Sequence, residues 1–405
     1  MIKMTDLNLA GKRVLIRSKL PLMQWRYVGS AFQDSAHIYH SHLKRSLATI
    51  DMAIKAGAKV MVIADFVNIS ERERNADPDS KKLIDRLQNN LGVPVRFARD
   101  YLDGIEVEAG KLVLLESCKI NTGEQNDSDE LAQRYAALCD IFVMDDISCV
   151  YPSYDSPHGI AKYAPIACAG PLLVADLELA SRLRHNPERP LIIIDGNSRG
   201  ISFVFFGGSA ALADHMLVGN RSALALVVAA GHSVGTVIKD EREISDAECL
   251  AASCNIPLIT DVMESRFPHK DRVTVKPVSE LENDSRVVDI GPETASRFAA
   301  LVATAKTIIW IGRLGWEPQE GSRTVAHAVA ASSAYVVCTN GWLCSLLEQS
   351  GESERVNYLA YNTFEFWSAL TGETPRAVAI LEDRAKEMER LIQPDQTEGQ
   401  TSNSP

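Results

Sequence analysis

The sequence has few of the features that mark membrane, secreted or disulfide-stabilised proteins. Its longest apolar runs, such as residues 223–230, are far shorter than the roughly 20 residues that a membrane-spanning helix needs. Its 8 cysteines are scattered and include no Cys-X-X-Cys pair. In a chain of this length they favour buried thiols in a reducing compartment over a disulfide framework. We therefore expect a cytoplasmic protein with no membrane association.

Positive charge is also in short supply. The 405 residues carry 53 acidic side chains against 42 Lys and Arg, a formal net charge of −11. Because nucleic acids and anionic membranes bind cationic surfaces, this balance argues against both as general partners. The first residues lack the apolar core of a signal peptide, so no secretion signal is expected. With 46% hydrophobic and 23% charged residues, the composition excludes disordered, collagen-like and coiled-coil classes.

What the sequence does contain is a regular alternation of short apolar runs and helical patterns. Continuous apolar runs, each followed by a helix, are typical of a parallel sheet covered on both faces. A first set of predicted strands lies at residues 13–17, 59–64, 95–97, 112–115 and 141–144, and a second set at 190–194, 216–218, 287–290, 307–310 and 335–338. The two sets predict an α/β fold with two doubly wound parallel-sheet lobes.

The domain organisation follows from these two strand sets. We assign residues 1–170 to an N-lobe, residues 171–187 to a connecting helix and residues 188–373 to a C-lobe. Residues 374–391 have the pattern of a final amphipathic helix, and residues 392–405 are polar and predicted to be a disordered tail. Ligands of doubly wound sheets bind at the carboxyl ends of the strands, so functional side chains are expected there.

Several motifs, in order along the chain, resemble those of the phosphoglycerate kinase family. They are residues 11–17 (GKRVLIR), 57–60 (GAKV), 134–140 (RYAALCD), 168–173 (CAGPLL), 288–291 (VDIG) and 305–310 (AKTIIW). The resemblance covers roughly residues 1–391. It implies an N-lobe that binds 3-phosphoglycerate or its bisphosphate, a C-lobe that binds Mg-ADP or Mg-ATP, and hinge closure. It also implies a C-terminal helix that returns to the N-lobe.

The chain departs from the family pattern where the resemblance implies the phosphoglycerate site. Lys19 stands at the position of an Asp in the family's signature loop. Of the basic residues implied to hold phosphoglycerate, only Arg17 remains, with Lys119 as a partial substitute. His42 takes the place of the family's transition-state Arg, although Lys44 and Arg45 lie nearby in the sequence. Phosphate recognition depends on such cationic donors, so we expect phosphoglycerate binding to be lost.

Carboxylates appear at strand ends where the family has cationic or neutral phosphate contacts. Asp65 stands in the implied phosphate loop, Asp146 follows the family-like Asp145, and Asp195 opens the segment aligned with a glycine-rich nucleotide loop. These acids would repel a phosphate group. They could instead bind a cationic partner or a metal ion, or be solvated caps, and solvated caps are the interpretation that we adopt.

The implied nucleotide site keeps little of the family pattern. Phe203 replaces the Lys that contacts the transferred phosphoryl group, and Trp342 replaces the Asp that holds Mg²⁺. Arg199 and Glu317 are the remnants of this site, and residues 219–222 (GNRS) replace a triple-glycine loop. Four aromatic side chains are predicted to occupy the volume in which the resemblance places ATP. They are Phe203, Trp316, Trp342 and Phe364. They either fill the cleft themselves, which we favour, or form a new ligand site.

Three histidines within residues 37–42 raise the question of a metal site, since imidazoles suit Zn²⁺ or Ni²⁺. No acidic or Cys partner is identifiable, so we interpret them as a polar loop ahead of a helix and predict no metal site.

These losses predict a phosphoglycerate-kinase-like protein that is catalytically inactive, a scaffold or regulatory pseudoenzyme with an unidentified protein partner and no cofactor. One alternative is a divergent active phosphoglycerate kinase, which would use Mg-ATP and 3-phosphoglycerate. The other is a small-molecule binder that uses an aromatic C-lobe cleft. Phosphoryl transfer requires charge on the moving group to be neutralised by metal, Lys and Arg, and this requirement favours the inactive protein.

Overall fold

The computed structural model of the protein describes most of residues 1–405. It leaves out residues 19, 21–34, 65–77, 125, 127, 148–155, 197–207, 209, 236, 267–268, 283–284, 316–318, 340–345, 348–350, 361–362 and 393–405. The chain divides into two compact units, and each is described by itself. The first comprises residues 1–30, 39–179 and 373–405, and the second comprises residues 31–38 and 180–372.

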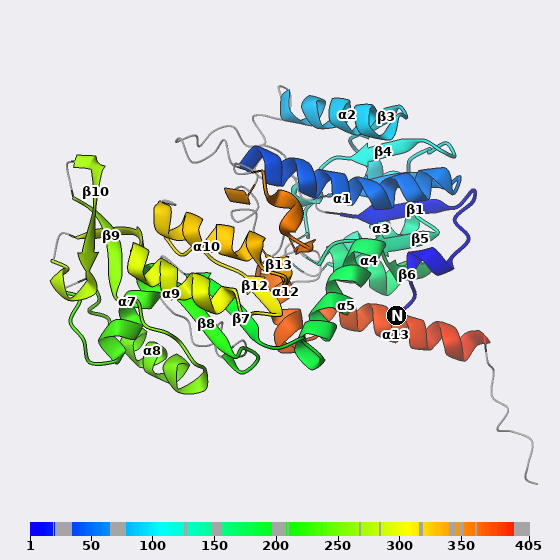
Figure 1. Ribbon diagram of the computed structural model, residues 1–405. Helices are drawn as coiled ribbons and strands as arrows, with labels where there is room; N and C mark the ends of the chain where they lie inside the picture. The colour runs from blue at the N-terminus through cyan, green and yellow to red at the C-terminus, as the bar shows by residue number, and fades with distance from the viewer. Residues whose placement is uncertain are drawn as a thin grey trace, which may run out of the picture. The chain divides into compact units, whose positions relative to one another are not determined.

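The first unit is built on a six-stranded parallel sheet with strand order β3-β4-β2-β1-β5-β6 (Figure 1). Its strands are β1 (Arg13–Arg17), β2 (Lys59–Ile63), β3 (Val95–Ala98), β4 (Leu112–Leu115), β5 (Ile141–Met144) and β6 (Ile166–Ala169). Arg17 pairs with Ile63 on one side and Met144 on the other, so the carboxyl ends of three strands coincide. Residues 14–16 are fully buried, which explains the continuous apolar run.

Helices pack around this sheet. They are α1 (Ser35–Lys55), α2 (Pro78–Leu91), α3 (Asp129–Ala137), α4 (Ser156–Tyr163), the first part of α5 (Pro171–His185) and α13 (Arg376–Ile392). One core layer joins α1 and α2 to the sheet through Val14, Ile16, Val60 and Val62 of the strands and Leu47, Ile50, Leu83 and Leu87 of the helices. The alternate positions Val14 and Ile16 share a face because side chains alternate along a strand. The apolar periodicity of α1 therefore marks the turns that face the sheet.

The beginning of α1 differs from the prediction. The histidine-containing stretch 37–42 was expected to be a loop, and this expectation is wrong, because α1 begins at Ser35. No Gly or Pro interrupts the sequence between Ser35 and Lys55, so nothing in the backbone chemistry stops the helix from extending beyond its apolar part.

The C-terminal helix α13 packs against α4 and β6 of the first unit (Figure 1). Leu381 of this helix is fully buried. Arg384 donates a hydrogen bond of 2.8 Å from Nη2 to the carbonyl oxygen of Ala164, which directly follows α4. The predicted return of this helix to the N-lobe is thereby confirmed.

The second unit is built on a five-stranded parallel sheet of order β14-β13-β12-β7-β8. Its strands are β7 (Leu191–Gly196), β8 (His215–Gly219), β12 (Thr307–Trp310), β13 (Tyr335–Cys338) and β14 (Tyr358–Leu359), and its helices include α7 (Asn220–Ala229), α8 (Glu241–Ser253), α9 (Pro292–Val302), α10 (Glu320–Ala331) and α12 (Thr363–Thr371). Asp289 fixes the start of α10, because its Oδ2 accepts hydrogen bonds of 2.8 Å from the backbone N–H groups of Gln319 and Ser322.

A separate three-stranded antiparallel sheet of order β10-β9-β11 completes the second unit. It consists of β9 (Asp261–Arg266), β10 (His269–Pro277) and β11 (Arg286–Ile290). The assignment of residues 287–290 to the second parallel set is therefore wrong in detail, since β11 pairs antiparallel with β9. Apart from these residues, the predicted fold class of two α/β lobes with parallel sheets is confirmed.

In the described part of the chain, no helix combines the length and the apolar character needed to cross a membrane. The cysteines there are free thiols, and Cys118, Cys139, Cys168 and Cys338 are buried as predicted. Cys249 is exposed, in contrast to the expectation of buried thiols.

Candidate functional site

The structure describes some of the site residues predicted from sequence and leaves others undescribed. Arg17, Lys119, Asp146 and Asp195 all lie at or just beyond the carboxyl ends of parallel strands, as expected. The predicted residues outside the described part are Lys19, Asp65, Arg199, Phe203, Trp316, Glu317 and Trp342. His42 and Phe364 belong to described helices, but their side chains lie outside the description. Among the described residues, no group of three or more His, Cys, Asp or Glu side chains is arranged to hold a metal ion.

Arg17 ends the central strand of the first unit. Its side chain is buried, with the residue only 2% exposed, and its Nη1 donates to the carbonyl oxygen of Ser18 at 3.3 Å. The carbonyl oxygen of Arg17 accepts a hydrogen bond of 3.0 Å from the backbone N–H of Asp145, which follows β5. The sheet therefore brings this arginine and the family-like aspartate to the same edge.

Asp145 is engaged with the start of α5. Its Oδ1 accepts a hydrogen bond of 3.2 Å from the backbone N–H of Leu172, in the first turn of that helix. Burial raises the pKa of the Asp145 carboxyl well above its usual range, and the nearby carboxyls of Asp146 and Asp176 raise it further. A Cβ added at Gly170 would lie 2.1 Å from Asp145 Oδ1, which explains why glycine stands in this motif. Asp145 thus has a structural role at a helix end.

Asp146, the acid that directly follows Asp145, is buried, with only 4% of the residue exposed. Two further charged residues of the first unit, Arg45 and Asp176, contact each other. Arg45 of α1 forms an ion pair with Asp176 of α5, with 3.5 Å between Nη2 and Oδ1. Sequence reasoning placed Arg45 and Lys44 close to the position of the family's transition-state Arg. The fold gives Arg45 a buried carboxylate as its neighbour and leaves Lys44 exposed.

Lys119 lies in the short 3-10 helix Cys118–Ile120 that follows β4, and its side chain is half-buried. Just before it, Glu116 pairs with Arg99 at 3.7 Å. Just after it, Asn121 donates hydrogen bonds from Nδ2 to the hydroxyls of Tyr101 and Tyr135 at 2.8 and 2.7 Å. The segment that carries Lys119 is thus held by side-chain contacts of Glu116 before it and of Asn121 after it.

Asp195 is the last residue but one of β7 in the second unit. It is 3% exposed, and its Oδ1 accepts a hydrogen bond of 2.7 Å from the backbone N–H of Gly196. The interpretation of the strand-end acids as solvated caps is therefore wrong for Asp195 and for Asp146, because packing at the strand ends buries both residues. A Cβ added at Gly312 would lie 1.9 Å from this oxygen, so the carboxyl group packs directly against the segment after β12. Burial raises the pKa of Asp195 to about 7.

A further charged residue at this edge was not among those predicted from sequence. Arg221, in the first turn of α7, donates from Nε and Nη2 to Oε2 of Glu243 at 3.2 and 2.9 Å. Its Nη1 donates to the carbonyl oxygen of Val237 at 3.0 Å. The substitution of the glycine loop by residues 219–222 was visible in the sequence, but nothing in the sequence indicated that α8 would bind this arginine.

The architecture defines a two-unit α/β protein with buried charged residues at the carboxyl ends of its parallel strands. The family model described as phosphoglycerate kinase matches residues 4–373. Phosphoglycerate kinase from Coxiella burnetii is similar at 30% sequence identity, with 95% of this chain and 99% of that chain covered and a TM-score of 0.78. Phosphoglycerate kinase from Pyrococcus horikoshii OT3 shares the fold at 19% identity, with 96% and 100% covered and a TM-score of 0.76.

The chain belongs to the phosphoglycerate kinase family. The resemblance inferred from the sequence motifs is thereby confirmed.

Proposed function

We propose that this member of the family does not catalyse phosphoryl transfer and acts as a scaffold or regulatory protein through a protein partner in the cytoplasm. The observation that carries the proposal is Asp195. Its carboxyl group is buried at the end of β7, where the sequence resemblance implies a glycine-rich loop against the nucleotide. Neither the ionised nor the protonated carboxyl suits that position, for two separate reasons.

The first reason is electrostatic, since an ionised Asp195 would repel a phosphate group in a site sheltered from water. The second is steric. A glycine leaves room for backbone N–H groups to approach phosphate closely, whereas the Asp195 side chain fills the space against Gly312. The described residues at this edge therefore do not fit a nucleotide phosphate, and we derive no catalytic step through Mg-ATP.

The arginines near both strand-end edges support the same proposal. Arg45 in the first unit and Arg221 in the second each have a carboxylate neighbour in the fold, Asp176 and Glu243 respectively. Phosphoryl transfer depends on cationic groups that neutralise the moving phosphoryl group. Arginines that serve intramolecular ion pairs are poor substitutes for the family residues missing from positions 42 and 203.

The proposal is tested by assaying the full chain with Mg-ATP and 3-phosphoglycerate beside phosphoglycerate kinase from Coxiella burnetii as the positive control. Loss of one transition-state donor typically lowers a rate about 10²- to 10³-fold. With several such groups replaced, we expect turnover at least roughly 10³-fold below the control. A rate within about tenfold of the control would overturn the proposal.

An active, divergent phosphoglycerate kinase is the second candidate. It is favoured by the 30% identity to the Coxiella burnetii protein across 95% of this chain and by Arg17 at the end of β1. It predicts measurable turnover in the same assay. The third function, an aromatic ligand site in the C-lobe, depends on side chains that the structure does not describe and remains a prediction.

A further inference from the structure

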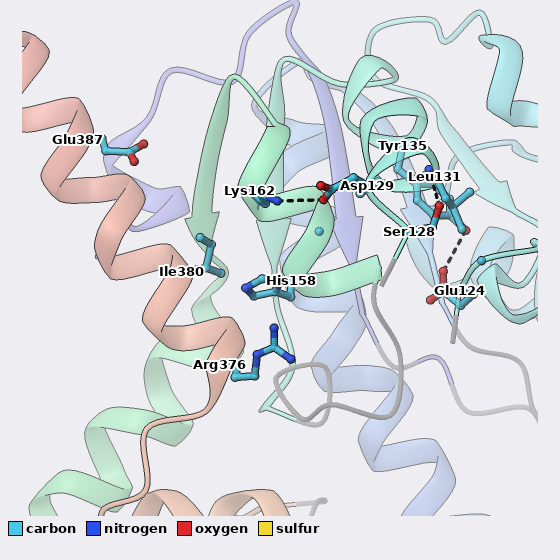
Figure 2. Close-up of a pocket in the computed structure, with 13 residues that line it drawn as sticks. Glu124, Ser128, Asp129, Leu131, Tyr135, His158, Lys162, Arg376, Ile380 and Glu387 are labelled. Carbon is cyan, nitrogen blue, oxygen red and sulfur yellow. Dashed lines mark hydrogen bonds and ion pairs between the residues drawn. The ribbon is translucent and has the colours of Figure 1, made fainter. Parts of the chain in front are cut away.

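A cavity of about 490 Å³ lies in the first unit, lined by residues of α3, α4 and α13 (Figure 2). Carboxylates outnumber the lysine and arginine side chains of its lining, and Figure 2 shows Lys162 paired with Asp129 at 2.9 Å. Arg376 and His158 also interact with other groups of the protein. The described lining of this cavity therefore leaves no cation unengaged.

A second cavity, of about 720 Å³, lies at the amino-terminal ends of the strands in the first unit. It is lined by the first residues of β1, β2, β3 and β4 and by the segment 105–108. Neither Arg17 nor the acids at the carboxyl ends of the strands line it. Its volume is within the range of about 300–1,000 Å³ that is usual for small-molecule sites.

Cations outnumber carboxylates in the lining of this second cavity, although the chain as a whole has a formal net charge of −11. The sheet places three of the cations side by side. Arg13 is paired in register with Lys59, and the next pair along β2 and β4 is Val60 with Leu112. Lys111, directly before β4, is therefore level with Lys59. The charged lining residues are Arg13, Lys59, Arg96, Lys111, Glu106 and Glu108.

The two cations that flank Lys59 are engaged within the fold, whereas Lys59 is not. Arg13 pairs with Asp140 at 2.7 Å, and Lys111 pairs with Glu108 at 2.6 Å. Lys59 is half-buried and makes no ion pair or side-chain hydrogen bond with any residue that the structure describes. A partly desolvated charge without a counter-charge is unfavourable, and like charges on neighbouring strands add to the penalty. An anion in the cavity would offset both effects.

The fourth cation of the lining, Arg96, has neighbours of its own. Its Nη2 donates to the carbonyl oxygen of Glu106. Lys111 and the nearby Arg96 both hold the pKa of the Glu108 carboxyl below its usual range. The Glu108 carboxylate is therefore already balanced by these two cations. Lys59 remains the lining cation whose charge no described acid neutralises.

We propose that this cavity binds a small organic anion, a carboxylate or a phosphate monoester, whose charged group accepts hydrogen bonds from Lys59. An ammonium group offers three donors around a compact charge, and hydrogen bonds between ionised groups are the strong ones. The apolar part of the ligand contacts the half-buried Ile105 and Val107 and the buried Val113, which line the same cavity. The cavity thus combines an unneutralised cation with an apolar wall.

The test is isothermal titration of the full chain at low ionic strength with benzoate, phenyl phosphate and benzamide. We expect at least one of the two anions to bind, and K59Q to weaken that binding about 10- to 100-fold, as expected for loss of a hydrogen bond to a charged group. K59R, which keeps the charge, should retain part of the affinity. The matched control is K12Q, because Lys12 is exposed and precedes Arg13 but does not line the cavity.

The pattern among the probes identifies the anion. Binding of phenyl phosphate alone assigns a phosphate monoester, and binding of benzoate assigns a carboxylate. Benzamide has the ring of benzoate without its charge, so it should bind at least about tenfold more weakly than the anion that binds. The proposal is overturned if neither anion binds the unmodified protein, if benzamide binds as tightly as that anion, or if K12Q weakens binding as much as K59Q.

Thermal unfolding separates lost binding from lost folding. K59Q removes a side chain without a described partner and relieves repulsion between neighbouring strands, so its Tm should equal or exceed that of the parent protein. The titration contains no nucleotide, so its outcome is independent of the kinase assay.

Discussion

At the scale of single residues, Asp195 illustrates how a carboxyl group can weaken the fold that buries it. Its pKa is raised to about 7 in the folded protein, against an ordinary value near 3.9 in an unfolded chain. The folded state therefore binds the proton more tightly. The stabilising effect of that proton is complete below about pH 4, and it is lost as the pH rises toward 7.

This linkage predicts the effect of D195N, which removes the ionisable group and keeps a hydrogen-bond acceptor for Gly196. The gain in unfolding free energy of D195N over the parent should be about 2 kcal/mol larger at pH 8 than at pH 5.5. Urea unfolding of both proteins at the two pH values measures the difference, and other titrating groups cancel in the comparison. An identical difference at both pH values would contradict the assignment.

Arg45 and Arg221 show, also at the residue scale, that a cation near a site in sequence need not serve that site. Each lies close to a position at which the family resemblance implies a phosphate contact. Asp176, which binds Arg45, comes from a helix more than a hundred residues further along the chain, and Glu243, which binds Arg221, comes from α8. Partner choice of this kind is set by packing, and sequence proximity carries no information about it.

At the scale of elements, the sequence pattern and the structure agree on the packing of α13. Its amphipathic pattern predicted a packed helix, and in the structure α13 packs against α4 and β6 with Leu381 fully buried. In contrast, the polar strands β9 and β10 carried no apolar run that could be predicted. They belong to a small antiparallel sheet, in which one face can be solvated.

The packing of α13 leads to a prediction with a neighbouring control. L381A removes a fully buried side chain and should lower the unfolding free energy of the first unit by about 2–4 kcal/mol. E382A, at the exposed next position, should change it by no more than roughly 0.5 kcal/mol. Calorimetric unfolding of the two variants provides the measurement. Equal, small effects would show that α13 contributes little to the stability of this unit.

At the scale of the whole molecule, the two units of the family fold are present and the strand-end charges of this chain differ from the family pattern. A ligand that binds the folded state raises its stability in proportion to the logarithm of ligand concentration over Kd. At about 100 times Kd the gain is roughly 2.7 kcal/mol, which is readily seen as a rise in Tm.

We therefore expect Mg-ATP and Mg-ADP to leave the Tm of the full chain unchanged. Phosphoglycerate kinase from Coxiella burnetii, measured beside it, should be stabilised. A comparable rise in Tm for both proteins would favour the active kinase over the non-catalytic protein.

The sequence by itself determined the α/β class, most of the parallel strands, the family and the strand ends at which this chain departs from it. Those properties are encoded in local apolar periodicity and in short motifs, which need no knowledge of distant contacts. Only the tertiary structure decided that Asp195 is buried against Gly312, that Arg45 pairs with Asp176, and that α13 closes a cavity on the first unit. Each of these contacts joins residues far apart in the chain, and packing rather than local pattern selects them.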